Sequence, residues 1–218
     1  MKFGIGQSVP RKEDPRLVTG GGQFTADLNL NGQLHLRVLR SPYAHGAIKT
    51  LDVAAAVAAP GVRAVYTAAD LSELGGMPCR AVLTDAEGNP AFIPHRPILA
   101  EDKVCFVGQA VAAVVADSVE AANAAVEFID FDVDEVVANA DPARSLGADT
   151  PVLHAENGSN LCVHYENGDA RAVDDALANS AHVVEVSLVN NRVAPSPLEP
   201  RACIGLFEEG RFTLYNPS

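Results

Sequence analysis

Residues 103–133 read KVCFVGQAVAAVVADSVEAANAAVEFIDFDV, and this stretch decides the fold. A strand is predicted over residues 103–107, followed by a turn at Gly108-Gln109. Residues 110–116 form a continuous apolar run, which is typical of a strand covered on both faces. The two strands therefore predict a sheet whose centre is buried.

The second half of the stretch predicts a helix and a returning strand. Asp117, with Glu120 three residues later, resembles a capping box for a helix over residues 118–128. A strand over residues 129–133 follows. Strand, turn, strand, helix and strand in this order indicate an α+β domain.

The residues before this stretch show strand and short-helix patterns in alternation. Residues 34–40 alternate apolar and polar side chains, which is the period of a half-buried strand. Further strands are predicted over 47–51 and 62–67, and short helices over 53–59 and 68–74, with Asp52 capping the first helix. Residues 75–97 contain four prolines and are predicted to be a loop.

The C-terminal part carries weaker signals. Residues 134–168 are polar and rich in turn residues, which indicates a linker laid over a surface. Asp169 is predicted to cap a helix over 170–180. Strands are predicted over 183–189, 202–207 and 212–215, with a turn at Glu208-Glu209-Gly210 between the last two.

Composition excludes several classes of function. The 218-residue chain has a formal net charge of −12. This charge argues against binding to nucleic acid or to an anionic membrane surface. No apolar run reaches the length of a membrane span, and the N-terminus lacks the apolar stretch of a secretory signal. We therefore expect a cytoplasmic protein.

The sequence offers no clustered metal ligands. The cysteines are isolated, and we expect them to be buried small hydrophobic residues in a reducing compartment: Cys79, Cys105, Cys162 and Cys203. No two histidines lie at i and i+4 on a helix, and none has a cysteine at zinc-ligand spacing. Surface or structural roles are therefore expected for the histidines: His35, His45, His95, His154, His164 and His182.

Other candidate sites have simpler structural interpretations. Gly20-Gly21-Gly22 lacks the context of a phosphate-binding loop, which favours a flexible joint or tight turn. No nucleophile elbow marks a catalytic serine. Carboxylates cluster at Asp130, Asp132, Asp134 and Glu135, and alternation with Phe131 and Val133 predicts that they lie on a solvated strand face. Glu199 and Arg201 are predicted to form a buried charge pair.

Several segments together resemble the start of the large, molybdenum-binding subunit of the xanthine dehydrogenase and aldehyde oxidase family. The branch they resemble is the bacterial carbon monoxide dehydrogenase-like large subunits. The segments are VPRKEDPRLVTG at 9–20, RSPYAH at 40–45, PGV at 60–62, VGQAVAAVVA at 107–116, RVAP at 192–195 and EPR at 199–201. Each is weak alone, but the six occur in order over nearly the whole chain.

The resemblance implies the domain organisation. Residues 1–22 would be an extended N-terminal arm, 23–135 an α/β hammerhead domain, and 136–180 a linker with a short helix. Residues 181–218 would be the first strands of a molybdopterin-binding domain that is truncated here. The chain is thus expected to be the N-terminal portion of a larger subunit and to have a structural or assembly role.

The resemblance also implies the chemistry of the whole subunit. Such enzymes hydroxylate aldehydes, N-heterocycles or similar substrates with oxygen from water. The implied cofactors are molybdenum with molybdopterin cytosine dinucleotide, and FAD and [2Fe–2S] clusters on partner subunits. The family's molybdenum-side glutamine, cofactor loop and catalytic glutamate are all missing from this chain. We therefore assign it no catalytic, cofactor-binding or metal-ligating residue.

Two alternatives differ in class. One is a standalone, non-catalytic protein-interaction module with the hammerhead fold. The other is an unrelated small hydrolase, which the absence of a nucleophile motif disfavours. Beyond the remainder of the subunit and its companion subunits, self-association is an expected interaction, because residues 181–218 would present unpaired strand edges.

Overall fold

The computed structural model describes residues 4–6, 8–191, 193–197, 199 and 201–217. The chain divides into two units by its internal contacts. One unit is residues 34–183, and the other combines 1–33 with 184–218. Arg192 and Pro200, which belong to the C-terminal signature segments, lie outside the described residues.

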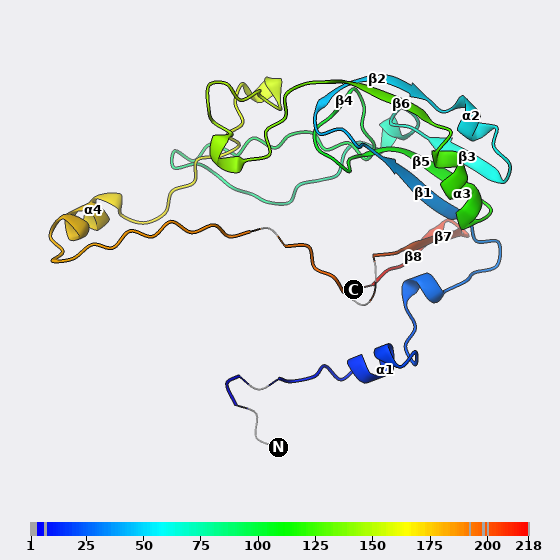
Figure 1. The fold of residues 1–218 in the computed structure, drawn as a ribbon, viewed down its shortest axis with the longest axis horizontal. Coiled ribbons are helices and arrows are strands. Elements are labelled where there is room, and N and C mark those ends of the chain that lie inside the picture. The colour runs from blue at the N-terminus through cyan, green and yellow to red at the C-terminus, as the bar shows by residue number, and fades with distance from the viewer. Residues whose placement is uncertain (1–3, 7, 192, 198, 200, 218) are drawn as a thin grey trace. The chain divides into compact units, whose positions relative to one another are not determined.

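The unit of residues 34–183 contains two three-stranded antiparallel sheets (Figure 1). In the first sheet the order is β1 (His35–Arg40), β5 (Ala110–Ala116) and β3 (Val62–Tyr66). In the second the order is β4 (Lys103–Val104), β2 (Gly46–Asp52) and β6 (Asp130–Glu135). The predicted α+β class is confirmed.

Strand β5 forms the centre of the core, as its apolar run predicts. Ala112 and Val114 are fully buried in one cluster with residues of the helices. On the opposite face, Val111 is fully buried in a second cluster with Val104 and Val133 of the other sheet. Both faces are covered, and this explains why the strand carries no polar alternation.

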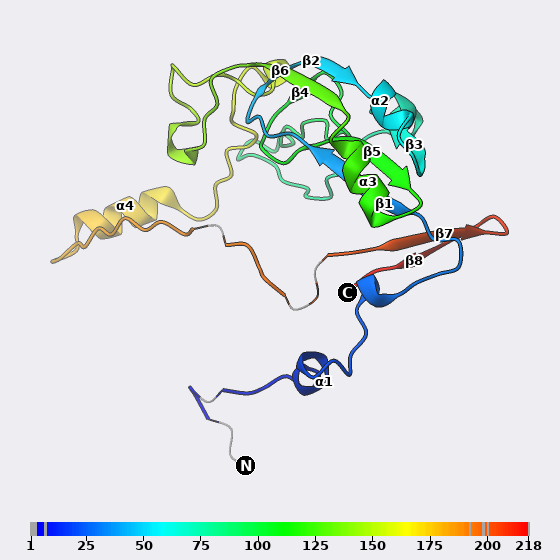
Figure 2. The same ribbon diagram turned by 45° about the vertical axis from the view of Figure 1, so that its right-hand side comes forward.

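Helix α3 (Val119–Val126) covers the first sheet, and both views show it beside β1 and β5 (Figures 1 and 2). Its cap differs from the prediction. Ser118, rather than Asp117, is the N-cap, and its hydroxyl oxygen accepts the backbone N–H of Ala121 at 3.1 Å. The Asp117 carboxylate is instead paired with the guanidinium of Arg63 at 2.6 Å.

The shorter helices follow the sequence with small differences. The Asp52 carboxylate accepts the N–H of Ala54 at 2.9 Å, at the start of α2 (Ala54–Val57). The helix predicted over 68–74 is a 3₁₀ helix, η2 (Ala69–Leu74).

Residues 136–183 carry three short elements, η3 (Pro142–Arg144), η4 (Ala155–Asn157) and α4 (Ala170–Ala178). Asp169 caps α4 as predicted, because its carboxylate accepts the N–H of Ala172 at 2.9 Å. In both views the segment carrying η3 and η4 lies near β4 and β6 (Figures 1 and 2). The segment is therefore folded onto the domain that precedes it.

The other unit contains α1 (Asp14–Val18), η1 (Thr25–Asp27) and a hairpin of β7 (Ile204–Glu208) and β8 (Arg211–Tyr215). The arm predicted to be extended thus includes a short helix. Gly20 follows that helix with a φ of 75°, and Gly21 donates its N–H to the carbonyl of Arg16 at 2.8 Å. The glycine triplet begins as a tight turn at a helix end.

The hairpin turn lies where the sequence places it. Glu209 and Gly210 have φ values of 50° and 77°, the left-handed conformations of a tight hairpin turn. The rings of Phe207 and Phe212 lie 4.5 Å apart across the two strands.

Three further predictions about the fold are wrong. Residues 183–189 are exposed and form no strand. An alternating pattern forms a strand only where a neighbouring strand and a covering layer are present. The first strand of the central stretch ends at Val104 instead of residue 107. Glu199 makes no ion pair with Arg201 among the described residues, since its carboxylate accepts the N–H of Thr25 at 2.8 Å.

Candidate functional site

Two signature segments, RSPYAH and VGQ, lock together at one end of the first sheet. Ser41 is 2% exposed; its backbone N–H donates to the carbonyl of Gln109 at 2.9 Å, and its carbonyl accepts the N–H of Gly108 at 2.8 Å. The Arg40 guanidinium donates to the carbonyl of Gly108 at 2.8 Å. The Gln109 side chain accepts the N–H of Cys105 at 2.7 Å. These bonds fix two loops that are distant in sequence.

Tyr43 connects the RSPYAH loop to the second sheet. Its hydroxyl donates to the Asp132 carboxylate at 3.4 Å, and its ring packs edge-on against Phe131 with centroids 5.8 Å apart. The Lys49 ammonium lies 3.0 Å from the same carboxylate. Hydrogen bonding from Lys49 lowers the pKa of Asp132, and burial together with that carboxylate raises the pKa of Tyr43.

His45 ends the same loop and is held from both sides. Its Nδ1 lies 3.1 Å from the carbonyl oxygen of Val104, and its own carbonyl accepts the N–H of Val136 at 3.1 Å. Burial lowers the pKa of the His45 imidazole, and the positive charges of Lys103 and His154 act in the same direction. Both effects favour the neutral form of the imidazole.

The segment after β6 folds into a wall opposite these loops. Asn160 organises it: its side-chain carbonyl accepts the N–H of Leu153 at 2.9 Å, and its amide donates to the carbonyls of Ser145 and Pro151, both at 3.0 Å. The Lys103 ammonium attaches the wall to β4 by donating to the carbonyl of Leu153 at 3.0 Å.

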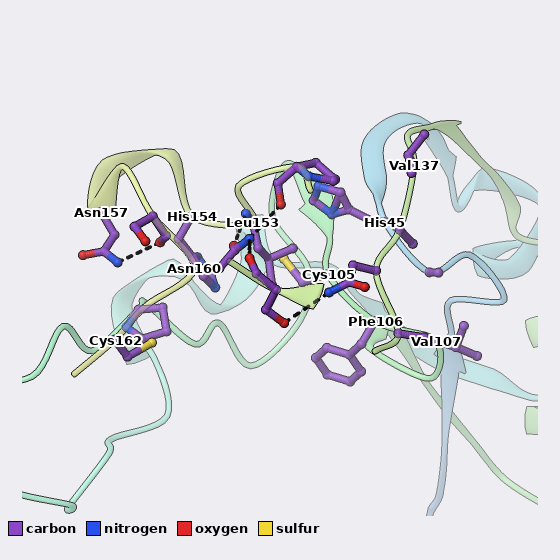
Figure 3. A pocket seen from close by; sticks show the side chains of 18 of the residues that line it. His45, Cys105, Phe106, Val107, Val137, Leu153, His154, Asn157, Asn160 and Cys162 are labelled. Atoms are coloured by element: carbon purple, nitrogen blue, oxygen red, sulfur yellow. Dashed lines mark hydrogen bonds between the residues drawn. The ribbon is translucent and has the colours of Figure 1, made fainter. Parts of the chain in front are cut away.

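A cavity of about 490 Å³ lies between the loops and the wall (Figure 3). Its lining is mainly apolar and includes Phe92, Phe106, Val107 and Leu153. The volume is in the range of small-molecule sites, and such sites are largely apolar with a few polar groups. This cavity is the candidate functional site.

The cavity brings together residues that the sequence left apart. His45, His154, Cys105 and Cys162 all line it. The expectation that the cysteines are buried is wrong for three of them: Cys79, Cys162 and Cys203 are exposed, and Cys105 is half-buried. The reason is their place in loops and extended segments, which lack the neighbours needed for burial. The RSPYAH and VGQ motifs, which supply His45 and Val107 to the lining, are the local sequence signals of the site.

The site does not have the donor set of a metal centre. Among the residues that the structure describes, no three His, Cys, Asp or Glu side chains gather to hold a metal ion. Among these residues, the cavity therefore has no set of side chains that would coordinate a metal ion directly. In the same residues, no helix is long and apolar enough to cross a membrane.

Family comparison identifies the chain. Residues 19–136 match the model of the a/b hammerhead domain of aldehyde oxidase and xanthine dehydrogenase. The chain belongs to this family. Residues 153–218 of this family member match a molybdopterin cofactor-binding domain. The expected family and the expected start of a molybdopterin-binding domain are thus confirmed.

Named relatives support the assignment. The chain is 37% identical to the nicotine 6-hydroxylase large subunit of Paenarthrobacter nicotinovorans, with 97% of this chain and 25% of that protein covered. It is 36% identical to the carbon monoxide dehydrogenase large chain of Hydrogenophaga pseudoflava, over 94% of this chain and 26% of that protein. Quinoline 2-oxidoreductase from Pseudomonas putida 86 has a similar structure, with a TM-score of 0.80 and 33% sequence identity. The match covers 99% of this chain and 27% of that one.

The chain spans about a quarter of the length of these relatives. The cavity in this hammerhead family member is lined from both matched domains. His45 and Cys105 belong to the hammerhead match, and Leu153, His154 and Cys162 to the cofactor-domain match. The cavity therefore lies where the two sequence families meet within one folded unit.

Proposed function

We propose that the chain is the N-terminal portion of the large subunit of a molybdenum hydroxylase. The observation that carries the proposal is the order of the two family matches, hammerhead at residues 19–136 and cofactor domain at 153–218. The complete subunit would hydroxylate an aldehyde, an N-heterocycle or a similar carbon centre, with water as the oxygen source. This portion would serve folding and assembly, and would not contain a complete active site.

The proposed domain organisation keeps the bounds that the sequence predicts. Residues 1–22 are an arm, 23–135 the hammerhead domain, 136–180 a linker with a short helix, and 181–218 the beginning of the cofactor domain. The hammerhead core around β5 supports a scaffold role, because both its faces are buried in apolar clusters. The linker supports it too, because it is fastened to β4 through Lys103.

The proposed cofactors and partners belong to the assembled enzyme. Molybdopterin in its cytosine dinucleotide form would be bound by the cofactor domain of the complete subunit. Companion subunits would carry FAD and [2Fe–2S] clusters and receive the electrons. We propose a cytoplasmic location for this complex.

The activity is tested on the complete subunit, produced with its companion proteins in a host that makes the molybdenum cofactor. The expected product of an N-heterocycle such as quinoline is a hydroxylated ring that carries ¹⁸O when the water is labelled. Products without label, or no turnover with any aldehyde or N-heterocycle, would contradict the proposed reaction.

The scaffold role is tested separately. Val114→Ala removes apolar volume from the core and should reduce the amount of assembled complex. Turnover per bound molybdenum should stay unchanged. Leu36→Ala, at an exposed position of the same sheet, is the matched control and should leave the yield unchanged. Residues 1–218 produced alone should contain no molybdenum by elemental analysis; one equivalent would show that this portion holds the cofactor itself.

A further inference from the structure

Nearly all of the polar side chains around the cavity form hydrogen bonds within the wall, the segment that carries Asn157 and Asn160. Asn160 uses its carbonyl and both amide hydrogens on backbone groups of the linker. The Asn157 amide donates to the carbonyls of Ser159 and Leu161 at 2.8 and 2.9 Å. These amides position the wall and are not available to a ligand. The cavity is therefore apolar apart from a few remaining groups.

His45 supplies one of those groups, and its tautomer can be derived. A carbonyl oxygen only accepts hydrogen bonds, so the contact of Nδ1 with the Val104 carbonyl places the proton on Nδ1. In the neutral ring Nε2 is then an unprotonated acceptor. No hydrogen-bond partner of Nε2 occurs among the described residues, while the ring lines the cavity.

The chemistry of the remaining lining defines what fits. Phe92 and Phe106 offer aromatic walls, and the Phe92 ring packs at a tilt against His154 with centroids 6.1 Å apart. A volume of about 490 Å³ is enough for a one- or two-ring compound. An anion would place its lone pairs against the Nε2 lone pair, whereas an O–H or N–H donor would be satisfied there.

We propose that this cavity binds a small neutral aromatic compound with an O–H or N–H donor on its ring edge, and that this donor bonds to Nε2 of His45. The rings of Phe92 and Phe106 contact the apolar body of the ligand. The site takes residues from the hammerhead match and the cofactor-domain match, so an occupied cavity holds the linker against the hammerhead. This inference does not depend on the proposed catalytic activity.

The test compares two probes on the 218-residue chain by ¹H–¹⁵N chemical-shift titration. Phenol carries the donor, and anisole has the same ring with the donor methylated. Phenol should bind about fivefold more tightly than anisole, the ratio expected for one net hydrogen bond. Both should shift the amides of Cys105, Phe106 and Val107. Equal affinities, no binding, or shifts confined to other parts of the chain would overturn the proposal.

A variant assigns the acceptor. In His45→Phe, phenol should bind no better than anisole, and anisole should bind as it does to the parent chain. His164→Phe is the matched control, because His164 is exposed on the linker and does not line the cavity. It should retain the preference for phenol. If His45→Phe fails to fold, the two probes on the unmodified chain still decide the question.

The pH dependence gives an independent readout. Phenol stays neutral below about pH 9, because a phenolic hydroxyl has a pKa near 10. Protonation of His45 removes the Nε2 acceptor, so phenol should lose its advantage over anisole in acid. Lys103 on β4 and His154 on the linker face this imidazole, and with burial they lower its pKa. The loss should therefore occur below about pH 6.5, the ordinary value for histidine. A preference that rises toward acid would contradict the assigned tautomer.

Discussion

The backbone N–H of Ser41 donates to the carbonyl oxygen of Gln109 at 2.9 Å, and this bond joins the RSPYAH loop to the VGQ turn. The hydroxyl of Ser41 adds two bonds within its own loop, since it accepts the N–H of Tyr43 and donates to the Tyr43 carbonyl, both at 3.0 Å. A serine at this position therefore satisfies partly buried backbone groups of Tyr43 that an apolar residue would leave unpaired.

Ser41→Ala should lower the free energy of unfolding by about 1–3 kcal/mol, because the partly buried backbone groups of Tyr43 lose their partner. Urea unfolding measures the loss. Ser180→Ala is the control, since the Ser180 hydroxyl also bonds a backbone carbonyl, at 2.7 Å, but at an exposed position. An equal effect of the two substitutions would mean that the Ser41 hydroxyl has no special role.

Val114→Asp tests the burial of β5. Val114 is fully buried against the helices, so an aspartate there would be an unpaired charge in an apolar cluster. We expect a loss of several kcal/mol or a failure to fold. Leu36→Asp places the same charge on neighbouring β1 at a residue that is 62% exposed, and it should melt close to the parent. A Val114→Asp variant that melts with the parent would exclude this core.

The Lys49–Asp132 pair should make stability depend on acid. Hydrogen bonding from Lys49 lowers the pKa of Asp132 in the folded state. A depressed carboxyl pKa adds stability that is present above the unfolded value, about 3.9, and is lost as the pH falls through the folded value. In Asp132→Asn the unfolding free energy should therefore fall less below about pH 4.

Urea unfolding between pH 7 and pH 2 measures this slope. Asp130→Asn removes a carboxylate from the same strand that makes no ion pair among the described residues, and it serves as the control. If Asp130→Asn flattened the acid slope as much as Asp132→Asn, the effect would come from net charge instead of the pair.

Local patterns predicted the fold where the interactions are local or the burial is complete. A few neighbouring residues are enough to predict the buried strand β5, the Asp169 cap and the Glu209-Gly210 turn. The Asp117 cap was wrong because Ser118 offers an equally good oxygen one residue later. Adjacent candidates of this kind cannot be separated by spacing alone.

The cavity could not be predicted in the same way. His45 and His154 are distant in the sequence, and they line one cavity because Asn160 and Lys103 hold the linker back over β4. Those contacts are hydrogen bonds between two side chains and backbone N–H and carbonyl groups, and such bonds leave no periodic signal in the sequence. The RSPYAH motif marked one wall, and the tertiary fold supplies the other.

The exposed segment of residues 183–191 leads to the last prediction. Its valines alternate as in a strand, yet every residue in it is exposed and none belongs to a strand. Exposed backbone of this kind exchanges its amide hydrogens rapidly, whereas the ladder of β5 is protected. In dilute solution, residues 183–191 should therefore exchange far faster than residues 110–116.

Varying the protein concentration shows whether slow amide exchange in this segment comes from pairing with a second copy or from a partner within the chain. An apolar, unpaired strand-like segment can pair with the same segment of a second copy. We expect residues 183–191 to gain protection as the chain is concentrated, together with a rise in mass by light scattering. Val186→Lys should abolish both changes, because like charges would face each other in the paired strands. Val173→Lys, at an exposed position in α4, is the control and should leave them intact. Protection equal to that of residues 110–116 in a dilute monomer would mean that this segment already has its partner within the chain.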